Sequence, residues 1–358
     1  MARAYLDWNA TAPLRPEARR AMADAMDIVG NPSSVHHEGR AAKALVERAR
    51  TQLAAAIGCK PAEVIFTSGA TEAASVLSRL SAGNGVLVDP TAHDCLWSHR
   101  NVSPTPLDSG GNTLAMGLAN SETGIITHPP ARVDGLWQHG GQRASVLLLD
   151  IVQAVGRIPF SFAWSGADMA IVSAHKFGGP KGIGALILRE GLDITALSTG
   201  GGQEMGRRAG TENLIGIAGL GAAAEAAAHD LANGVWDEVA QLRNILETAL
   251  SVGAKGTISV GTGAERLPNT LCLIAPGWKG ETQVMALDLA GYAVSAGSAC
   301  SSGKVRTSRV LQAMGFEGDL AGQAIRISIG PGVTKDTLLR FADVWLALYA
   351  KVLARNAG

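Results

Sequence analysis

The chain has 358 residues, of which 47% are hydrophobic and 17% charged, so it can bury a large core and is neither a disordered tail nor a small disulfide-stapled module. Basic and acidic residues balance at 31 each, which argues against a nucleic-acid partner or an anionic membrane surface. Since the four cysteines form no CxxC pair and neither a signal peptide nor an apolar run of roughly 20 residues is evident, we expect a soluble, cytoplasmic protein with reduced thiols.

Short apolar runs alternate with helical patterns through the first half of the chain. A helical pattern covers residues 40–58, and strands are predicted at 64–67, 85–88, 146–149, 169–172 and 184–188. This alternation predicts the α/β class, with a mostly parallel sheet covered by helices on both faces. Polar clusters follow three of the strands, and ligands of such sheets bind beyond the carboxyl ends of the strands, so we expect a cofactor site there.

The second part of the chain predicts a smaller domain. An alanine-rich helical segment at 217–251, interrupted at Asn233-Gly234, is interpreted as the bridge to it. Strands near 271–274 and 324–329 and a final helix at 335–354 follow. We therefore expect a large domain of residues 14–245 and a small α/β domain made of residues 1–13 and 246–358.

The strand at 64–67 turns through Ser68-Gly69 into a helix that begins near Ala70 and Thr71. Free backbone amides and the positive end of the helix dipole make such a start a good phosphate site. An ordinary helix cap fits the same residues.

Asp150 ends a strongly apolar strand in VLLLDIVQAVGR, with Gln153 three residues later. A buried carboxylate needs a partner, and a protonated pyridine nitrogen suits it because the ion pair keeps the ring an electron sink. A helix cap or an ion pair with an arginine such as Arg157 is the alternative. Gln153 could reach the hydroxyl oxygen of the same ring.

Lys176 follows the next strand, in IVSAHKFGGPKG. Burial at a strand end lowers the pKa of a lysine and frees its amine to bond covalently to a carbonyl cofactor. A solvated surface lysine is the commoner role. Lys181 is the rival in the same loop, although Pro180 and the flanking glycines favour a turn there.

Cys300 lies in SAGSACSSGKVRTSRVL, a stretch rich in small and polar residues that predicts a flexible loop. Such a loop can bring a thiolate to a substrate sulfur and then carry the sulfur outward. The alternative is a small hydrophobe in a core, which is the usual role of a free cysteine. The other three cysteines, Cys59, Cys95 and Cys272, adjoin hydrophobic residues and are interpreted as structural.

Eight motifs occur in order along the chain: YLDWNATAPL, GNPSSVHHEGRAA, FTSGATEA, DIVQAVGR, SAHKFGGPKGIGAL, GRRAGTEN, GSACSSG and AIRISIG. Together they resemble the cysteine desulfurases of the nitrogen-fixation and iron–sulfur-cluster type, within the class V aminotransferase group of fold-type I pyridoxal-phosphate enzymes. The resemblance covers essentially the whole chain. It implies a large domain with a mostly parallel sheet of the seven-stranded type and a smaller C-terminal α/β domain.

The resemblance also assigns roles to the matching residues. Lys176 would hold pyridoxal 5'-phosphate covalently and Cys300 would take up the sulfur. The ring would contact Asp150, Gln153 and His93, and the phosphate would contact Ala70, Thr71, Ser173 and His175, with Thr211 from the second subunit of a homodimer. Arg326 would bind the substrate carboxylate with help from Asn31, and Arg208 would lie near the phosphate or the dimer contact.

Two of these residues have plainer alternatives when the sequence is taken alone. A lone histidine after a strand, such as His93, is more often an ordinary polar loop residue than a catalytic one. Within the family, stacking and proton transfer are the roles implied for it, and a flat ring with a pKa near operating pH suits both. Arg326 could equally form a structural ion pair.

The implied activity converts L-cysteine to L-alanine and leaves the sulfur as a persulfide on Cys300, for iron–sulfur clusters or other sulfur compounds. A sulfur-acceptor or scaffold protein is the implied partner, and no metal is expected. Ser121 stands where the family has a ring-contacting asparagine, and the chain ends soon after the final helix. These two features motivate one alternative, a weakly active assembly or binding subunit. Selenocysteine cleavage or transamination is the other, because the fold and the lysine are shared across the group.

Overall fold

The structure is a computed structural model that describes residues 3–80, 85–100, 111–297 and 307–357. The chain divides into two compact units. The large unit comprises Pro13–Leu118 and Thr127–Ala232, and the small unit comprises Met1–Ala12, Ala119–Ile126 and Asn233–Gly358. The division after residue 232 falls at the helix break predicted at Asn233-Gly234, whereas the expected boundary at 245 lies inside a helix.

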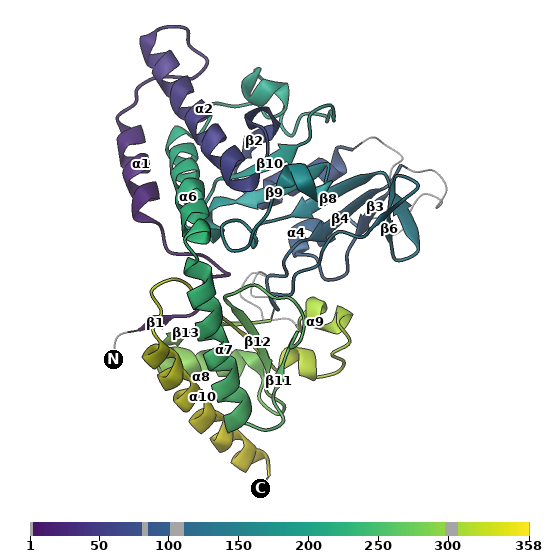
Figure 1. Cartoon of the computed structure of the whole chain (residues 1–358), viewed down its shortest axis with the longest axis vertical. Helices are drawn as coiled ribbons and strands as arrows, with labels where there is room; N and C mark the ends of the chain where they lie inside the picture. Colours follow the sequence, from purple (N-terminus) through teal and green to yellow (C-terminus); the bar gives the residue numbers. More distant parts are fainter. Residues whose placement is uncertain (1–2, 81–84, 101–110, 298–306, 358) are drawn as a thin grey trace. The chain divides into compact units, whose positions relative to one another are not determined.

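The large unit is built on a sheet whose strand order is β2-β10-β9-β8-β4-β3 (Figure 1). Its strands are β2 (Val64–Thr67), β3 (Val86–Val88), β4 (Thr113–Gly117), β8 (Val146–Asp150), β9 (Met169–Ser173) and β10 (Gly184–Leu188). The described residues thus supply six strands where the resemblance implies seven. Each of β2, β9 and β10 is buried along its whole length, as expected for apolar strands covered on both faces.

Strand direction places several chain segments at one edge of this sheet. β3, β4, β8 and β9 are mutually parallel, and β10 runs antiparallel to both β9 and β2. Every strand except β10 therefore ends at the same edge. The segments that follow β2, β3, β8 and β9, which carry the predicted cofactor residues, all begin there.

Helices cover the sheet. They are α1 (Pro16–Met26), α2 (His37–Ile57), α3 (Ala70–Ala74), α4 (Asp94–Trp97), α5 (Phe162–Ser165) and α6 (Leu214–Ala232). A small antiparallel sheet of β5 (Arg132–Val133), β6 (Leu136–His139) and β7 (Gln142–Ala144) was not anticipated from the sequence. It precedes β8 in the chain.

Helix α6 corrects one expectation from the sequence, because it is long and apolar enough to cross a membrane by length and composition. Its packing supplies another reason for that composition. α6 lies against α1 and α2 (Figure 1) and buries nine residues. A Cβ on Gly221 would lie 2.6 Å from Ala49 Cα, so the helices meet at a distance that only glycine permits. We interpret α6 as a core helix of the large unit.

The small unit has a four-stranded sheet in the order β11-β12-β15-β14. Its strands are β11 (Ile258–Ser259), β12 (Thr270–Ile274), β14 (Ser295–Ala296) and β15 (Ala324–Ser328), and its helices are α7 (Val235–Gly253), α8 (Gly280–Leu289), α9 (Arg309–Ala313) and α10 (Lys335–Asn356). Near the N-terminus, β1 (Ala4–Tyr5) pairs in parallel with β13 (Tyr292–Ala293). The first residues of the chain therefore complete the small unit.

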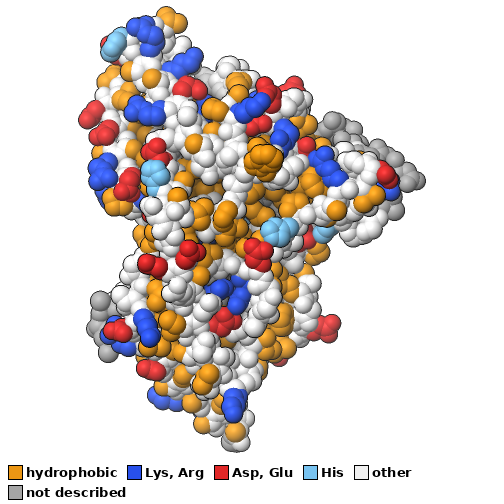
Figure 2. Space-filling view, in the orientation of Figure 1, with side chains coloured by type: hydrophobic (Ala, Val, Ile, Leu, Met, Phe, Trp, Pro, Cys, Tyr) orange, Lys and Arg blue, Asp and Glu red, His pale blue; other side chains and the backbone are white. Residues whose placement is uncertain are grey.

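Acidic and basic side chains are interspersed over the visible surface, as the balanced composition predicts (Figure 2). Within the residues that the structure describes, histidine, cysteine, aspartate and glutamate form no group of three that could hold a metal ion.

Candidate active site

Asp150 and Lys176 lie at the ends of adjacent parallel strands. Asp150 is the last residue of β8 and is in register with Ile171 of β9. Lys176 closes the short 3-10 turn Ala174–Lys176, which follows β9 directly. The structure thus brings together the two residues on which a pyridoxal-phosphate site most depends.

The surroundings of the Asp150 carboxylate disfavour its negative charge unless a positive charge lies nearby. Burial raises its pKa, while the charges of His93 and Lys176 and a hydrogen bond from the Val152 N–H (2.9 Å to Oδ1) act in the opposite direction. Because the net pKa is still raised, the cations already present do not fully offset the cost of burying the charge. A protonated pyridine nitrogen would complete that compensation, so Asp150 fits the predicted cofactor.

Arg157 organises the neighbouring Gln153 and Lys176. Its Nη1 donates to Gln153 Oε1 at 2.6 Å and its Nη2 donates to the Lys176 carbonyl at 2.7 Å. Arg157 and Gln153 are both buried. The amide nitrogen of Gln153 is the end turned away from Arg157, and this end can donate to a ring hydroxyl oxygen. Arg157, which the sequence offered as a partner for Asp150, instead fixes the turn that carries Lys176.

His93 is the N-cap of α4, and its Nδ1 accepts the Cys95 N–H at 3.1 Å. In a neutral imidazole this bond leaves the proton on Nε2. The turn before it is fixed by Asp89, whose Oδ1 accepts the Thr91 N–H at 2.8 Å. His93 therefore combines the ordinary loop role with a ring whose orientation the hydrogen bond fixes, and it lies close enough to Asp150 to affect the pKa of that carboxyl.

The predicted phosphate residues gather where β2 and β9 end. Ala70 and Thr71 begin α3, and a Cβ on its N-cap Gly69 would lie 3.9 Å from the Ser173 hydroxyl. Gly184 permits this close approach, since a Cβ there would lie 2.7 Å from Gly69 Cα. Small residues thus leave the hydroxyl and the first amides of α3 side by side.

The electrostatics at His175 also fit a phosphate. Burial and the positive charges of Lys176, Lys181 and Arg157 lower the pKa of His175 to about 4. The ring is therefore neutral in a strongly positive environment. A phosphate dianion is the kind of ligand that such a field attracts.

Three further predicted residues lie in loops of the large unit, and their roles stay predictions. Thr211 is exposed and lines a cavity of about 250 Å³ together with Ser68 and Arg208. Arg208 donates through Nε to Glu72 at 2.9 Å. Asn31 is exposed in the loop before α2, where its Oδ1 accepts the Ser33 N–H at 2.9 Å.

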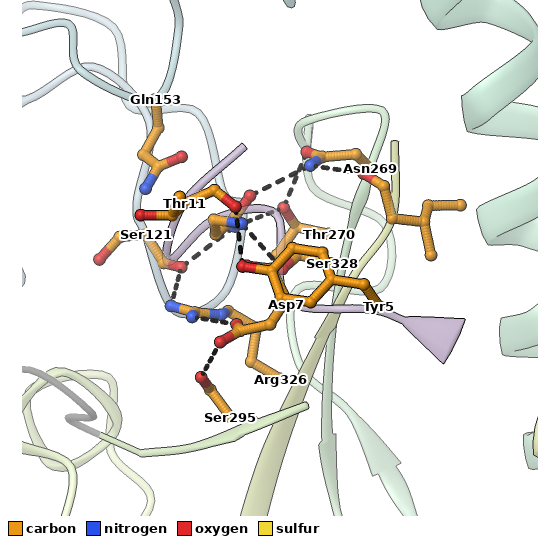
Figure 3. A network of polar contacts seen from close by, with 12 residues as sticks. Tyr5, Asp7, Thr11, Ser121, Gln153, Asn269, Thr270, Ser295, Arg326 and Ser328 are labelled. Carbon is orange, nitrogen blue, oxygen red and sulfur yellow. Dashed lines mark hydrogen bonds and ion pairs between the residues drawn. The ribbon is translucent and has the colours of Figure 1, made fainter. Parts of the chain in front are cut away.

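Arg326 lies in the middle of β15 and is buried in the small unit (Figure 3). Its Nη2 donates to Asp7 Oδ1 at 2.7 Å and its Nη1 to the Ser121 carbonyl at 3.0 Å. The structural ion pair that the sequence left open is thus present. The role of Arg326 toward a substrate carboxylate, and that of the Ser121 hydroxyl toward the ring, stay predictions.

Sequence reasoning assigned no role to Asn9, which lies fully buried beside this arginine. Its Nδ2 donates to the Ser121 carbonyl at 3.2 Å and to Thr270 Oγ1 at 2.9 Å, while its Oδ1 accepts from Asn269 at 3.1 Å. The segment YLDWNATAPL places Asn9 between the buried residues Leu6 and Ala12, but the partners of Asn9 lie far away in the sequence.

Cys300 lies outside the described residues, so its role in taking up sulfur stays a prediction. Burial raises the pKa of both Cys59 and Cys272 to about 12, and it also raises that of Cys95. These thiols stay protonated at neutral pH, which suits a structural role.

The fold and the residues at the strand ends define a pyridoxal-phosphate enzyme of fold type I. The chain belongs to the class V aminotransferase family, whose sequence pattern matches residues 4–96 and 104–341.

Relatives that span nearly the whole chain carry the name cysteine desulfurase. That of Cereibacter sphaeroides is 36% identical, with 96% of this chain and 95% of the relative aligned. The relative from Dictyoglomus turgidum, named cysteine desulfurase IscS, is 34% identical, with 95% of this chain and 93% of the relative aligned. Among solved structures, a NifS-like protein superposes with a TM-score of 0.84 at 29% identity, covering 98% of this chain and 100% of the other.

Proposed function

We propose that this protein is a cysteine desulfurase, which converts L-cysteine to L-alanine and retains the sulfur as a persulfide on Cys300. The observation that carries the cofactor chemistry is the placement of Lys176 and the half-buried Asp150 at the ends of adjacent strands. The choice of cysteine as substrate is supported by relatives of that name with 34–37% identity over more than nine-tenths of the chain.

Three predicted site residues of the large unit then have defined tasks. Pyridoxal phosphate, when bound, withdraws electrons from the substrate α-carbon. Lys176 would hold the cofactor through its amine and would move the α-proton, and Asp150 would keep the ring nitrogen protonated. His93 would contact the ring and share in proton transfer through Nε2.

The sulfur step is a displacement at the substrate thiol. The Cys300 thiolate attacks the substrate sulfur, an S–S bond forms, and the substrate C–S bond breaks. The electron pair of the broken bond stays on the β-carbon, which takes up a proton. Substrate cysteine and the Cys300 thiol are thereby converted to alanine and the Cys300 persulfide with no external oxidant.

The proposed enzyme acts with a second subunit and a sulfur-accepting protein in the cytoplasm. A homodimer is favoured because the family places Thr211 at the cofactor phosphate of the second subunit. A protein that accepts the persulfide sulfur, as an iron–sulfur scaffold or another sulfur carrier, completes the cycle. The balanced charge and the absence of CxxC pairs favour the cytoplasm.

Two variants test the proposal. Purified protein loaded with pyridoxal phosphate should release alanine from L-cysteine, and mass spectrometry should find one added sulfur atom on Cys300. The Cys300→Ser variant should lose desulfuration yet retain cofactor, whereas Lys176→Ala should lose the covalently held cofactor as well. Full activity of Cys300→Ser with selenocysteine or in transamination would replace this proposal with one of those reactions.

A further inference from the structure

Three segments that are far apart in the sequence meet at Arg326 within the small unit (Figure 3). The N-terminal segment supplies the Asp7 carboxylate and segment 119–126 supplies the Ser121 carbonyl. β14 supplies Ser295, whose hydroxyl donates to Asp7 Oδ2 at 2.8 Å. Each of the two Asp7 oxygens therefore has its own partner, and the carboxylate cannot rotate without losing one of them.

The backbone around Asp7 is fixed as firmly as its side chain. The Leu6 N–H donates to the Ala293 carbonyl at 2.9 Å and the Trp8 N–H to the Ser328 carbonyl at 3.0 Å. The Tyr5 hydroxyl contacts the Asp7 carbonyl at 3.0 Å. The carboxylate is thus presented to Arg326 from a rigid support and not from a mobile terminus.

This arrangement does not maximise the hydrogen bonding of Arg326. Its Nε is buried and has no hydrogen-bond partner among the described residues. A buried N–H that is left unpaired destabilises the folded state. Asp7 and Ser121 therefore hold the guanidinium in an orientation that stability alone does not favour, which is typical of a functional site.

We propose that Asp7 is a positioning residue for substrate recognition: it holds the Arg326 guanidinium in the orientation that binds an amino-acid carboxylate. The inference rests on the proposed function, which gives Arg326 its carboxylate ligand. An arginine side chain loses rotamer entropy when it binds a ligand, and Asp7 restricts the Arg326 side chain before substrate arrives. Asp7 thereby sets the preference for amino acids over amines that lack a carboxylate.

The test compares the affinity of two ligands that differ in the carboxylate. Protein loaded with pyridoxal phosphate, in the Cys300→Ser background to prevent turnover, is titrated with L-cysteine and with cysteamine while cofactor absorbance is followed. Asp7→Ala should weaken the binding of cysteine about tenfold and leave the binding of cysteamine unchanged. Asp7→Asn keeps an oxygen acceptor for Nη2 and should restore cysteine affinity to within about threefold.

A matched control is available on the surface. Asp288 pairs with Arg3, and both side chains are more than half exposed, so Asp288→Ala removes an aspartate from an ion pair to the N-terminal segment without touching Arg326. Asp288→Ala should change neither the affinity for cysteine nor that for cysteamine. If Asp7→Ala does not fold, Ser295→Ala, which frees one Asp7 oxygen, should weaken cysteine selectively by a smaller factor.

Two outcomes overturn the inference. If Asp7→Ala weakens the binding of cysteine and of cysteamine equally, Asp7 acts through general stability. If Asp7→Ala binds cysteine more tightly, Asp7 competes with the substrate carboxylate for Arg326. The proposed function fails separately, if the parent protein binds cysteine but forms no alanine.

Discussion

His175 is a half-buried ring among positive charges, and its titration leads to a prediction at the scale of one residue. Its folded pKa of about 4 lies below the ordinary value of 6.5. As pH falls from 6.5 toward 4, the unfolded chain takes up a proton that the folded chain refuses, so the stability of the cofactor-free protein declines in that window. His175→Gln should show a shallower decline.

Urea unfolding midpoints of both proteins at about pH 7 and about pH 5 measure the difference. Cofactor-loaded wild-type protein should also lose less stability than the cofactor-free form, because the phosphate charge raises the pKa of His175. An identical pH response in His175→Gln and wild type would assign the acid sensitivity to other groups.

At the scale of elements, a buried ion pair joins α2 to the segment that carries Arg208 and Thr211. Arg50 of α2 contacts both oxygens of Glu204 at 2.9 Å, and the Phe66 N–H of β2 donates to the same carboxylate at 2.8 Å. Glu204 and Met205 adopt left-handed backbone angles, with φ of 47° and 58°, which cost free energy in residues other than glycine. The ion pair holds that conformation.

Glu204→Gln should therefore lower the free energy of unfolding by about 3–5 kcal/mol, because it removes the buried carboxylate and leaves the Arg50 charge with only the exposed Glu47 as an ionic partner. Chemical denaturation of the cofactor-free protein measures this loss. Lys60→Gln offers a control, since its partner Glu190 and Lys60 itself are both largely exposed, and it should change stability by less than about 1 kcal/mol. A loss of similar size in both variants would contradict a special role for the buried pair.

The elements also show how far sequence reasoning reaches. The predicted strands at 64–67 and 184–188 match β2 and β10, because apolar runs bounded by polar turns carry a local signal. Asp150 and Lys176 were predictable from the positions of strand ends. The Asp7–Arg326 pair was not predictable, because the two residues are 319 positions apart in the sequence and neither carries a local signal for the position of the other. Strand β4 was also missed.

At the scale of the whole molecule, the proposed dimer can be tested by mixing two inactive variants. Lys176→Ala lacks the proposed catalytic amine, and Thr211→Ala lacks the threonine proposed to reach the second subunit. In a mixed dimer the site that retains Lys176 receives an intact Thr211 from its partner. Equimolar mixing should restore about a quarter of wild-type activity, because half of the dimers are mixed and each has one complete site.

Activity that stays at the sum of the two separate variants after subunit exchange would place Thr211 in its own subunit's site. Mixing Lys176→Ala with Asp150→Asn serves as the negative control, because both residues belong to the same large unit and exchange of subunits cannot restore a complete site.

The pairing of β1 with β13 has a consequence for how the protein is made. Strand β1 is synthesised long before its strand partner at residues 292–293, and Asp7 long before Arg326. The small unit therefore cannot close until β15 has been synthesised, whereas the last strand of the large sheet ends at residue 188. During that interval β1 is without its partner, and an unpaired strand of this kind favours aggregation.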